Sequence, residues 1–340
     1  MLSRILHAII ESLIPKRFEG VIEMILVFGD IHGCVEPLTQ LYAYLEPYIQ
    51  RASHCRLIFL GDYIDRGPAS REVVDFIRSI PVETVLLMGN HEDQLLMYQK
   101  GSDILAAYGN FWCTRRNGGL KTIQSFDPRS PLPRLIQEEG ALDQGSRTYV
   151  RNRGEFDLKP QYQTFFEHLR YIHEERVVRP KGDPIRYLFS HATPNPKVPL
   201  KEIFRAKSFE HFHALEQQYG IPIDESNIWN RSLLDQRIDN AILVHGHTPT
   251  HLLAGSYGSR FGVDRKVMEI LRQGHAYFRY EKGGGSLIQI NIDTGAVYGN
   301  RLSALMIVND PAEYTDPRWN GLHHAVFWVD ADGCQGHDKA

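Results

Sequence analysis

The stretch Gly61-Asp62-Tyr63-Ile64-Asp65-Arg66-Gly67 directly follows the apolar run Leu57-Ile58-Phe59-Leu60. An apolar run that stops at a glycine indicates a buried strand opening into a tight loop. This loop then offers two carboxylates and a guanidinium close together. Taken alone, such a group is more often a turn or a loop salt bridge than a functional site, because Asp and Gly are ordinary turn formers.

The same arrangement recurs twice more. Gly29-Asp30-Ile31-His32-Gly33 follows Met24-Ile25-Leu26-Val27-Phe28, and Gly89-Asn90-His91-Glu92 follows Val85-Leu86-Leu87-Met88. Loops that leave the carboxyl ends of parallel strands converge on one edge of a sheet, where ligands bind. The repetition therefore predicts one shared site instead of separate turns. Its expected members are Asp30, His32, Asp62, Asn90 and His91.

Helical periodicity follows each of these loops. Apolar residues recur at helical spacing over 36–48 and over 70–79, with Ser70 a candidate cap, and the third loop runs into a helix from Asp93. Repeated strand–helix units about 30 residues apart predict a parallel sheet with right-handed crossovers. A further helix is predicted over 161–175.

Histidines follow the strands predicted later in the chain. Ile185–Phe189 leads into Ser190-His191-Ala192, and Ala241–Val244 leads into His245-Gly246-His247-Thr248-Pro249. Either histidine segment alone would be read as strand-end histidines with satisfied hydrogen bonds. We favour that interpretation for His245, with support of a metal ligand from behind as the alternative. His191 and His247 join the expected site because carboxylate and amide groups follow the other strands.

Composition limits the class of protein. The chain has 340 residues, of which 42% are hydrophobic and 23% charged, so it can bury a core as one large α/β domain or a domain with insertions. A net charge of -3 argues against nucleic acid as a partner. The four cysteines are scattered without a CxxC pair, which favours reduced thiols and a cytoplasmic location.

The chain is divided here into three parts. Residues 1–23 are predicted to form an amphipathic helical appendage; charged residues interrupt it, so it suits neither a transmembrane helix nor a secretory signal. Residues 24–309 form the main domain, with insertions at about 126–160 and 250–286. Residues 310–340 form a C-terminal extension. No transmembrane segment is predicted, and the oligomeric state is left open.

The expected site has the composition of a two-metal centre. A pair of divalent ions needs a bridging carboxylate with nitrogen and oxygen ligands on either side. Mixed imidazole, carboxylate and amide ligands suit Mn first, with Fe or Zn as alternatives, and do not suit an all-oxygen Ca or Mg site. Asp30 and His32 can hold one ion, Asp62 can bridge both ions, and Asn90, His191 and His247 can complete the second.

These motifs taken together resemble the phosphoprotein phosphatase (PPP) family of dinuclear metallophosphoesterases. Gly-Asp-x-His-Gly, Gly-Asp-x-x-Asp-Arg-Gly, Gly-Asn-His-Glu, Ser-His-Ala and Gly-His-Thr-Pro carry the resemblance over roughly residues 24–309, and the bacterial branch is most similar. It implies an α/β calcineurin-like metallophosphoesterase fold, with two central β-sheets packed face to face and flanked by helices. It assigns the same six metal ligands in the same two groups.

The resemblance also implies a mechanism in which a metal-bridging hydroxide attacks phosphorus directly. His91 would protonate the leaving oxygen and Asp65 would orient the His91 imidazole. Arg66 would hold the phosphate, and Arg231 in Trp229-Asn230-Arg231 resembles the second phosphate arginine of the family. Asp293 is left open between orienting a ligand histidine and capping a turn.

Three functions are compatible with these residues. The leading prediction is a phosphatase acting on phosphomonoesters, most of all phosphoserine, phosphothreonine or phosphotyrosine in proteins. Met88 departs from the arginine that protein phosphatases of the family often carry, which motivates the alternative, a hydrolase of dinucleoside polyphosphates or other nucleotides. Those hydrolases, however, usually have Asp at the position of Glu92. A non-catalytic binding module is the third, although neither a metal ligand nor the proposed acid is lacking.

Overall fold

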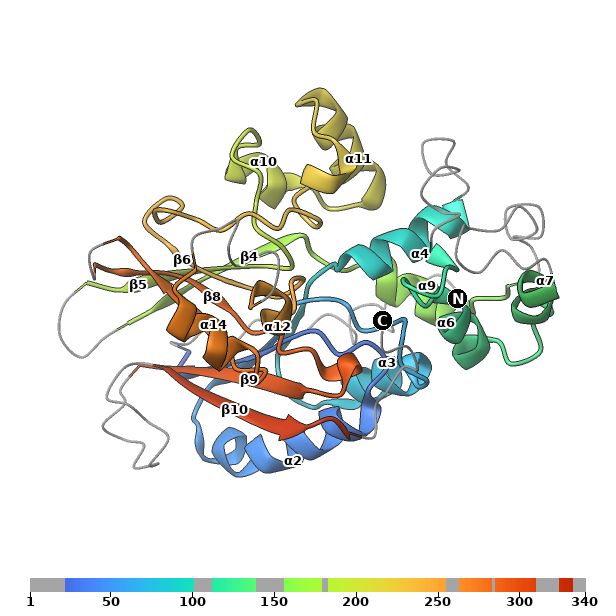
Figure 1. Ribbon diagram of the computed structural model, residues 1–340, viewed down its shortest axis with the longest axis horizontal. Coiled ribbons are helices and arrows are strands. Elements are labelled where there is room, and N and C mark those ends of the chain that lie inside the picture. The colour runs from blue at the N-terminus through green and yellow to red at the C-terminus, as the bar shows by residue number, and fades with distance from the viewer. Residues whose placement is uncertain are drawn as a thin grey trace, which may run out of the picture.

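The computed structural model describes residues 22–100, 112–138, 156–178, 183–254, 263–282, 285–309 and 324–332 (Figure 1). Its strands form two five-stranded sheets. The predicted helical appendage falls almost entirely outside the described residues, as do the middle of the insertion at 126–160 and most of the C-terminal extension. The predicted domain boundaries stay predictions.

The first sheet has the order β10-β9-β1-β2-β3. Strands β1, β2 and β3 run parallel, as the repeated strand–helix units predict, and β9 pairs antiparallel with β1. The edge strand β10 lies in the predicted C-terminal extension and pairs antiparallel with β9. The strands span Met24–Phe28 (β1), Cys55–Phe59 (β2), Thr84–Leu86 (β3), Arg301–Val308 (β9) and His324–Asp330 (β10).

The second sheet has the order β4-β5-β6-β8-β7. Its three central strands β5, β6 and β8 run parallel, and β4 and β7 flank them antiparallel. Both sheets thus contain a parallel group whose carboxyl ends can meet. The strands span Ile172–Val177 (β4), Ile185–Ser190 (β5), Ile242–His245 (β6), Tyr277–Tyr280 (β7) and Leu287–Asn291 (β8).

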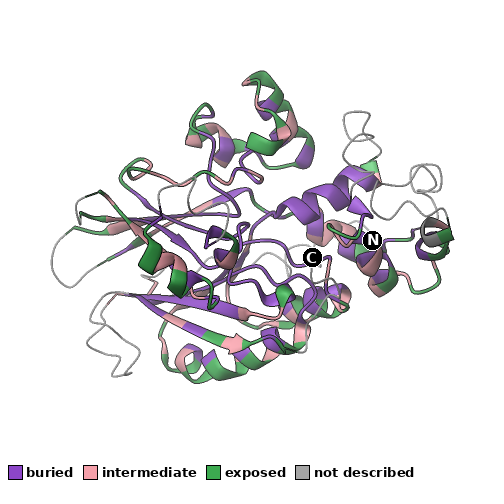
Figure 2. Ribbon diagram, viewed as in Figure 1, coloured by how far each residue is buried: buried purple, intermediate pink, exposed green. Residues whose placement is uncertain are grey.

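Strand β1 shows why the sheets pack face to face. Successive side chains of a strand point to opposite faces. Met24, Leu26 and Phe28 belong to the core cluster that contains the helices, whereas Ile25 and Val27 belong to a second cluster shared with the other sheet. Strand β1 is correspondingly buried along its whole length, whereas the edge strands β4, β7 and β10 also carry exposed positions (Figure 2). The predicted arrangement of two apposed sheets flanked by helices is confirmed.

Helices cover the first sheet and extend to one side of the molecule. Helices α2 and α3 pack on each other, and α2 contacts β9 and β10 (Figure 1). The described helices are α2 (Val35–Arg51), α3 (Ser70–Ser79), α4 (Asn90–Lys100), α6 (Gly119–Phe126), α7 (Leu132–Glu138), α9 (Pro160–Glu167), α10 (Leu200–Arg205), α11 (Phe209–Gln218), α12 (Thr250–Leu253) and α14 (Arg265–Leu271), with short 3-10 turns η3 (Ile223–Glu225) and η4 (Ala296–Tyr298).

The single helix predicted over 161–175 is wrong. Helix α9 ends at Glu167, and strand β4 begins at Ile172. Between them, the backbone N–H of Arg170 donates to Leu86 O at 2.9 Å, and Arg170 O accepts from Met88 N at 2.7 Å. This backbone pairing with residues 86–88 keeps the chain extended at Arg170, whereas the local apolar periodicity alone predicts that the helix continues.

Two smaller expectations also need correction. Ser70 is the first residue of α3 and not its cap, because the cap position is Ala69. Cys34 is disulfide-bonded, so the prediction of reduced thiols is wrong for it, whereas Cys55 and Cys113 are free. The described part of the predicted insertion at 250–286 contains α12, α14 and β7, which pack together through an apolar cluster, and its being an insertion stays a prediction.

None of the helices in the described part of the chain combines the length and the apolarity that a membrane span requires.

Candidate active site

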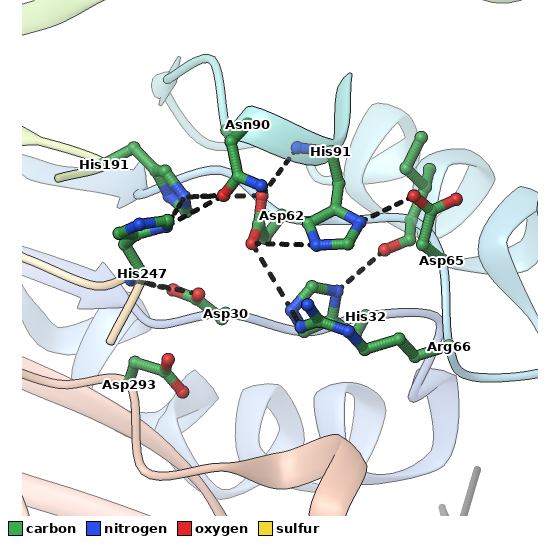
Figure 3. Close-up of polar contacts among 12 residues, drawn as sticks. Asp30, His32, Asp62, Asp65, Arg66, Asn90, His91, His191, His247 and Asp293 are labelled. Atoms are coloured by element: carbon green, nitrogen blue, oxygen red, sulfur yellow. Dashed lines mark hydrogen bonds and ion pairs between the residues drawn. The ribbon is translucent and has the colours of Figure 1, made fainter. Parts of the chain in front are cut away.

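The predicted ligands come from five loops that leave the carboxyl ends of parallel strands (Figure 3). In the first sheet, β1 leads to Asp30 and His32, and β2 leads to Asp62. All of the predicted ligands are buried, with exposures of 0–4%. The other three follow β3, β5 and β6 and are Asn90, His191 and His247.

Asp62 lies between two groups of ligand atoms. Its Oδ2 is 3.3 Å from His32 Nε2, and its Oδ1 is 3.4 Å from His191 Nε2. The same carboxylate belongs to two clusters whose ligand atoms all lie within 4.8 Å of one another. One cluster adds His32 and His91, and the other adds His191 and His247. A carboxylate with one oxygen toward each cluster has the position of a bridging ligand.

The second cluster is completed by an amide. Asn90 Oδ1 lies 2.9 Å from His191 Nε2 and 2.8 Å from His247 Nδ1. The two imidazole nitrogens are 3.2 Å apart. Three donor atoms of these residues, together with Asp62 Oδ1, therefore face one small volume.

Hydrogen bonds to backbone carbonyls fix the orientation of the three predicted ligand histidines. In each ring, the nitrogen that points away from the clusters donates a hydrogen bond to a backbone carbonyl. Because a carbonyl only accepts, that nitrogen carries the proton and the other nitrogen presents its lone pair. The pairs are His32 Nδ1 with Ile64 O, His191 Nδ1 with Leu60 O, and His247 Nε2 with Trp229 O, each at 2.9 Å.

Burial keeps these rings neutral. It lowers the pKa of His32 and His247 well below the ordinary value of an imidazole, and it lowers the pKa of His191 to about 3. A neutral imidazole is the form that binds a metal ion, so burial and hydrogen bonding favour the same state.

The pKa values of the buried carboxylates are shifted upward. Burial, and after it the repulsion from Asp293 and Asp62, raises the pKa of Asp30. Burial is also the largest cause that raises the pKa of Asp62 and of Asp293 to about 7. Buried carboxylates so close together require positive charge to ionise. Oriented neutral imidazoles, an amide oxygen and shared carboxylates therefore fit a pair of divalent cations.

Asp293 performs one of its two predicted roles. Its Oδ1 accepts a hydrogen bond from Gly295 N at 3.1 Å, which is a turn cap. The carboxylate also faces Asp30 (Figure 3). His245 is a strand-end histidine as interpreted: its Nδ1 donates to Gly246 O at 3.0 Å, and its Nε2 accepts from Gln289 Nε2 at 2.8 Å.

His91 has a different partner from the other site histidines. Its Nδ1 lies 2.6 Å from Asp65 Oδ2, and its Nε2 faces the clusters 4.0 Å from Asp62 Oδ2. Asp65 also accepts from Trp112 Nε1 at 2.6 Å and from Thr122 Oγ1 at 2.5 Å. Burial lowers the pKa of His91 and raises that of Asp65, so this buried pair favours a proton shared between them over two separated charges.

The two predicted phosphate arginines border opposite clusters. Arg66 Nη1 lies 2.6 Å from His32 Nε2, on the side of the first cluster. Arg231 Nη1 donates to His247 O at 3.1 Å and to Thr248 Oγ1 at 3.2 Å, on the side of the second. Their guanidinium groups can therefore contact an anion from two directions.

Glu92 was not predicted to belong to the site. It is fully buried, and its carboxylate accepts four backbone N–H groups: Oε2 accepts from Asp62 at 2.8 Å and Gly89 at 3.1 Å, and Oε1 accepts from Tyr63 at 2.8 Å and Ile64 at 3.2 Å. The loop that carries Asp62 is thus held by Glu92. The motif Gly-Asn-His-Glu was the available signal, since a buried glutamate requires partners.

Trp112 and Thr122 were also missed. They reach Asp65 from 47 and 57 positions away, and neither stands in a motif that follows a strand. Local sequence gives no signal for them.

The backbone of the site is left-handed at several non-glycine residues. Positive φ angles occur at His32 (49°), Asp62 (53°), Asp65 (72°), Arg66 (65°) and His247 (66°). Such conformations cost on the order of 1 kcal/mol or more each and persist only where the surroundings impose them. The side chains are therefore aimed by backbone that packing holds in place.

Comparison with known families agrees with this geometry. Residues 24–278 match the calcineurin-like phosphoesterase family. This chain belongs to that family and is a metallophosphoesterase.

Similar curated proteins share shorter segments. A symmetrical bis(5'-nucleosyl)-tetraphosphatase of Legionella pneumophila (strain Lens) is 41% identical over 68 residues, which cover 20% of this chain and 24% of that protein. The enzyme of that name from Stutzerimonas stutzeri (strain A1501) is 40% identical over 111 residues, which cover 33% of this chain and 36% of that protein. The matched segments thus span about a quarter to a third of these relatives.

A solved structure similar to this chain is the cold-active protein-tyrosine phosphatase of a psychrophilic Shewanella species. It has 15% identity and a TM-score of 0.42, and the match covers 85% of this chain and 76% of that chain.

Proposed function

We propose that this metallophosphoesterase uses two divalent ions, Mn first, to hydrolyse dinucleoside tetraphosphates. The observation that carries the two-metal proposal is the Asp62 carboxylate, whose two oxygens face separate clusters at 3.3 and 3.4 Å. One ion would be held by Asp30, His32 and Asp62, and the other by Asp62, Asn90, His191 and His247. When bound, the ions supply Lewis acidity that activates water and offsets charge on phosphate oxygens.

The other residues act on the phosphate and on protons. Arg66 and Arg231 bind phosphoryl oxygens from opposite sides, which fixes the phosphorus for attack by water. A new phosphorus–oxygen bond forms as the bond to the leaving oxygen breaks. His91 delivers a proton to that leaving oxygen from Nε2, while Asp65 at 2.6 Å holds the other side of the ring.

Met88 supports a nucleotide substrate over a phosphoprotein, and Glu92 does not oppose it. Met88 is 1% exposed and lies in the hydrophobic core, so its position contributes no cation to the phosphate. Glu92 contacts backbone N–H groups, so having Glu where dinucleoside hydrolases usually have Asp bears on the loop and not on the substrate. The names of the curated relatives point to the same substrate class.

A second candidate is hydrolysis of phosphoserine or phosphothreonine in proteins. The buried His91–Asp65 pair favours it, because an alkoxide leaving group needs a proton far more than a phosphate leaving group does.

Parallel rate measurements separate the two candidates. The Mn-loaded protein is assayed with diadenosine tetraphosphate and with a phosphoserine peptide. We expect kcat/KM to be about tenfold or more higher for the dinucleotide. The reverse ratio selects the protein phosphatase. Absence of hydrolysis of both, with metal bound, would support the binding module, and Asp62→Asn serves as the inactive control.

A further inference from the structure

An exposed aromatic ring lies beside the phosphate arginine. Tyr298, at the end of η4, is 46% exposed, although large hydrophobic side chains in the described part of the chain are mostly buried. The guanidinium carbon of Arg66 is 5.8 Å from the centre of the Tyr298 ring. Since Arg66 Nη1 is 2.6 Å from His32 Nε2, a single side chain separates this ring from the first cluster.

The turn that carries Tyr298 is tightly constrained. Gly295 and Gly299, on either side of η4, have φ angles of 78° and 76°, a conformation that suits glycine. Tyr298 N donates to Gly295 O at 3.0 Å, and the His251 ring meets the Tyr298 ring edge-on, with centroids 5.3 Å apart. The ring is thus held in place beside Arg66.

The surroundings of Tyr298 indicate what it can bind. A phosphate held by Arg66 places the group attached to that phosphate near the Tyr298 ring. Nucleobases stack on exposed aromatic side chains, and an adjacent guanidinium adds a cation–π contribution. A ring that served only to fill the core would not leave almost half of its surface accessible.

We propose that Tyr298 is a specificity-determining residue that stacks on a nucleobase of the substrate while Arg66 binds an adjoining phosphate. This inference rests on the proposed function, since it identifies where the nucleoside part of a dinucleoside tetraphosphate binds. The competing explanation is that Tyr298 only positions Arg66, in which case it would affect all phosphate ligands alike.

A pair of ligands distinguishes these explanations. ADP and pyrophosphate each carry two linked phosphates, but only ADP carries a nucleoside. The dissociation constants of both are measured by titration calorimetry on the Mn-loaded full chain, so the test requires no turnover. The variants are Tyr298→Ala and Tyr298→Phe, with Tyr280→Ala as the matched control, because Tyr280 is 47% exposed on the edge strand β7.

We expect Tyr298→Ala to raise the ratio of the ADP constant to the pyrophosphate constant roughly tenfold, the scale of one base–aromatic stack. Tyr298→Phe should restore the wild-type ratio, because the ring is retained, and Tyr280→Ala should not change it. Equal increases for both ligands, or no increase for either, would overturn the inference. Failure of the proposed function is read separately, as an absence of diadenosine tetraphosphate hydrolysis by the wild-type protein.

Discussion

The site holds two kinds of histidine, and their partners differ. His32, His191 and His247 each donate to a backbone carbonyl at 2.9 Å, whereas His91 pairs with the buried carboxylate of Asp65 at 2.6 Å. A carbonyl partner fixes a neutral tautomer and leaves a lone pair for a metal ion. A carboxylate partner also stabilises the imidazolium that forms when a proton is taken up.

Under the proposed function, the hydrogen-bond partner of each histidine would therefore separate metal binding from proton transfer within one pocket. Asp65 is shared with Trp112 and Thr122 on the side of α6. Two of the carbonyl partners, those of Leu60 and Ile64, belong to the loop that follows β2, and the third, that of Trp229, lies between η3 and β6. Substitutions on each side should therefore have different consequences for metal content.

The largest effect is expected at the carboxylate between the two clusters. Asp62→Asn removes the charge shared by both groups, so metal content and activity should fall together, activity on the order of 10⁴-fold. Metal analysis by mass spectrometry and turnover of an aryl phosphate measure the two effects. A variant that keeps two ions per chain would show that Asp62 does not bridge them.

A smaller and more selective effect is expected at His91. His91→Asn should keep the metal ions and lower turnover by about 10²–10³-fold, because the proton donor is lost. The loss should be greater for an alkyl phosphate than for an aryl phosphate, whose leaving group needs less protonation. Equal losses on both substrates, or unchanged turnover, would contradict the assigned role.

Asp65→Asn should lower turnover by about 10–100-fold with metal content unchanged. The amide preserves the shape of the buried side chain but no longer stabilises a charged imidazole. Combining it with His91→Asn tests whether the residues act as a unit, since the double variant should then lose little more than His91→Asn alone. Full additivity of the two losses would refute that coupling.

The smallest effect concerns a histidine–carboxylate pair away from the clusters. His213 Nε2 in α11 lies 2.9 Å from Asp93 Oδ1 in α4. Burial lowers the pKa of His213, but the Asp93 charge and hydrogen bond outweigh it, so the pKa ends above its ordinary value of 6.5. The pair therefore stabilises the fold below about pH 6.5, and this contribution is lost as the pH rises through the folded-state pKa.

Denaturant unfolding of wild type and His213→Gln measures that contribution. The free energy of unfolding of the wild type should exceed that of the variant by about 1 kcal/mol at pH 6, and this difference should shrink by pH 9. Turnover should be similar in both proteins, because this pair does not face the substrate. A stability difference that does not change with pH would show that packing, and not charge, links α11 to α4.

Much of the fold was predictable because local signals agreed. The apolar run Met24–Phe28 ends at a glycine and becomes β1, and the helical spacing over 70–79 becomes α3. The helix predicted over 161–175 is wrong beyond Glu167. The spacing of Phe165, Phe166 and Leu169 fits a helix, but the pairing of Arg170 with the β3 region ends it. That contact spans more than eighty positions and has no local signature.

The site residues also fall into those that local sequence predicts and those that it does not. Residues such as Asp62 and Asn90 stand directly after strands, so the topology alone brings them together. Trp112 and Thr122 reach Asp65 only because the chain around α6 returns to the site. Partners that depend on how a long segment returns were not predictable, whereas groups at strand ends were.

The left-handed backbone at Arg66 has a consequence for any attempt to make this protein more robust. At a φ of 65°, glycine has less backbone strain than arginine. Arg66→Gly should therefore raise the melting temperature while removing a guanidinium from the proposed phosphate site. Selection for heat resistance alone would thus favour residues that cannot do the chemistry. Position 66 nevertheless carries arginine, at the cost of backbone strain.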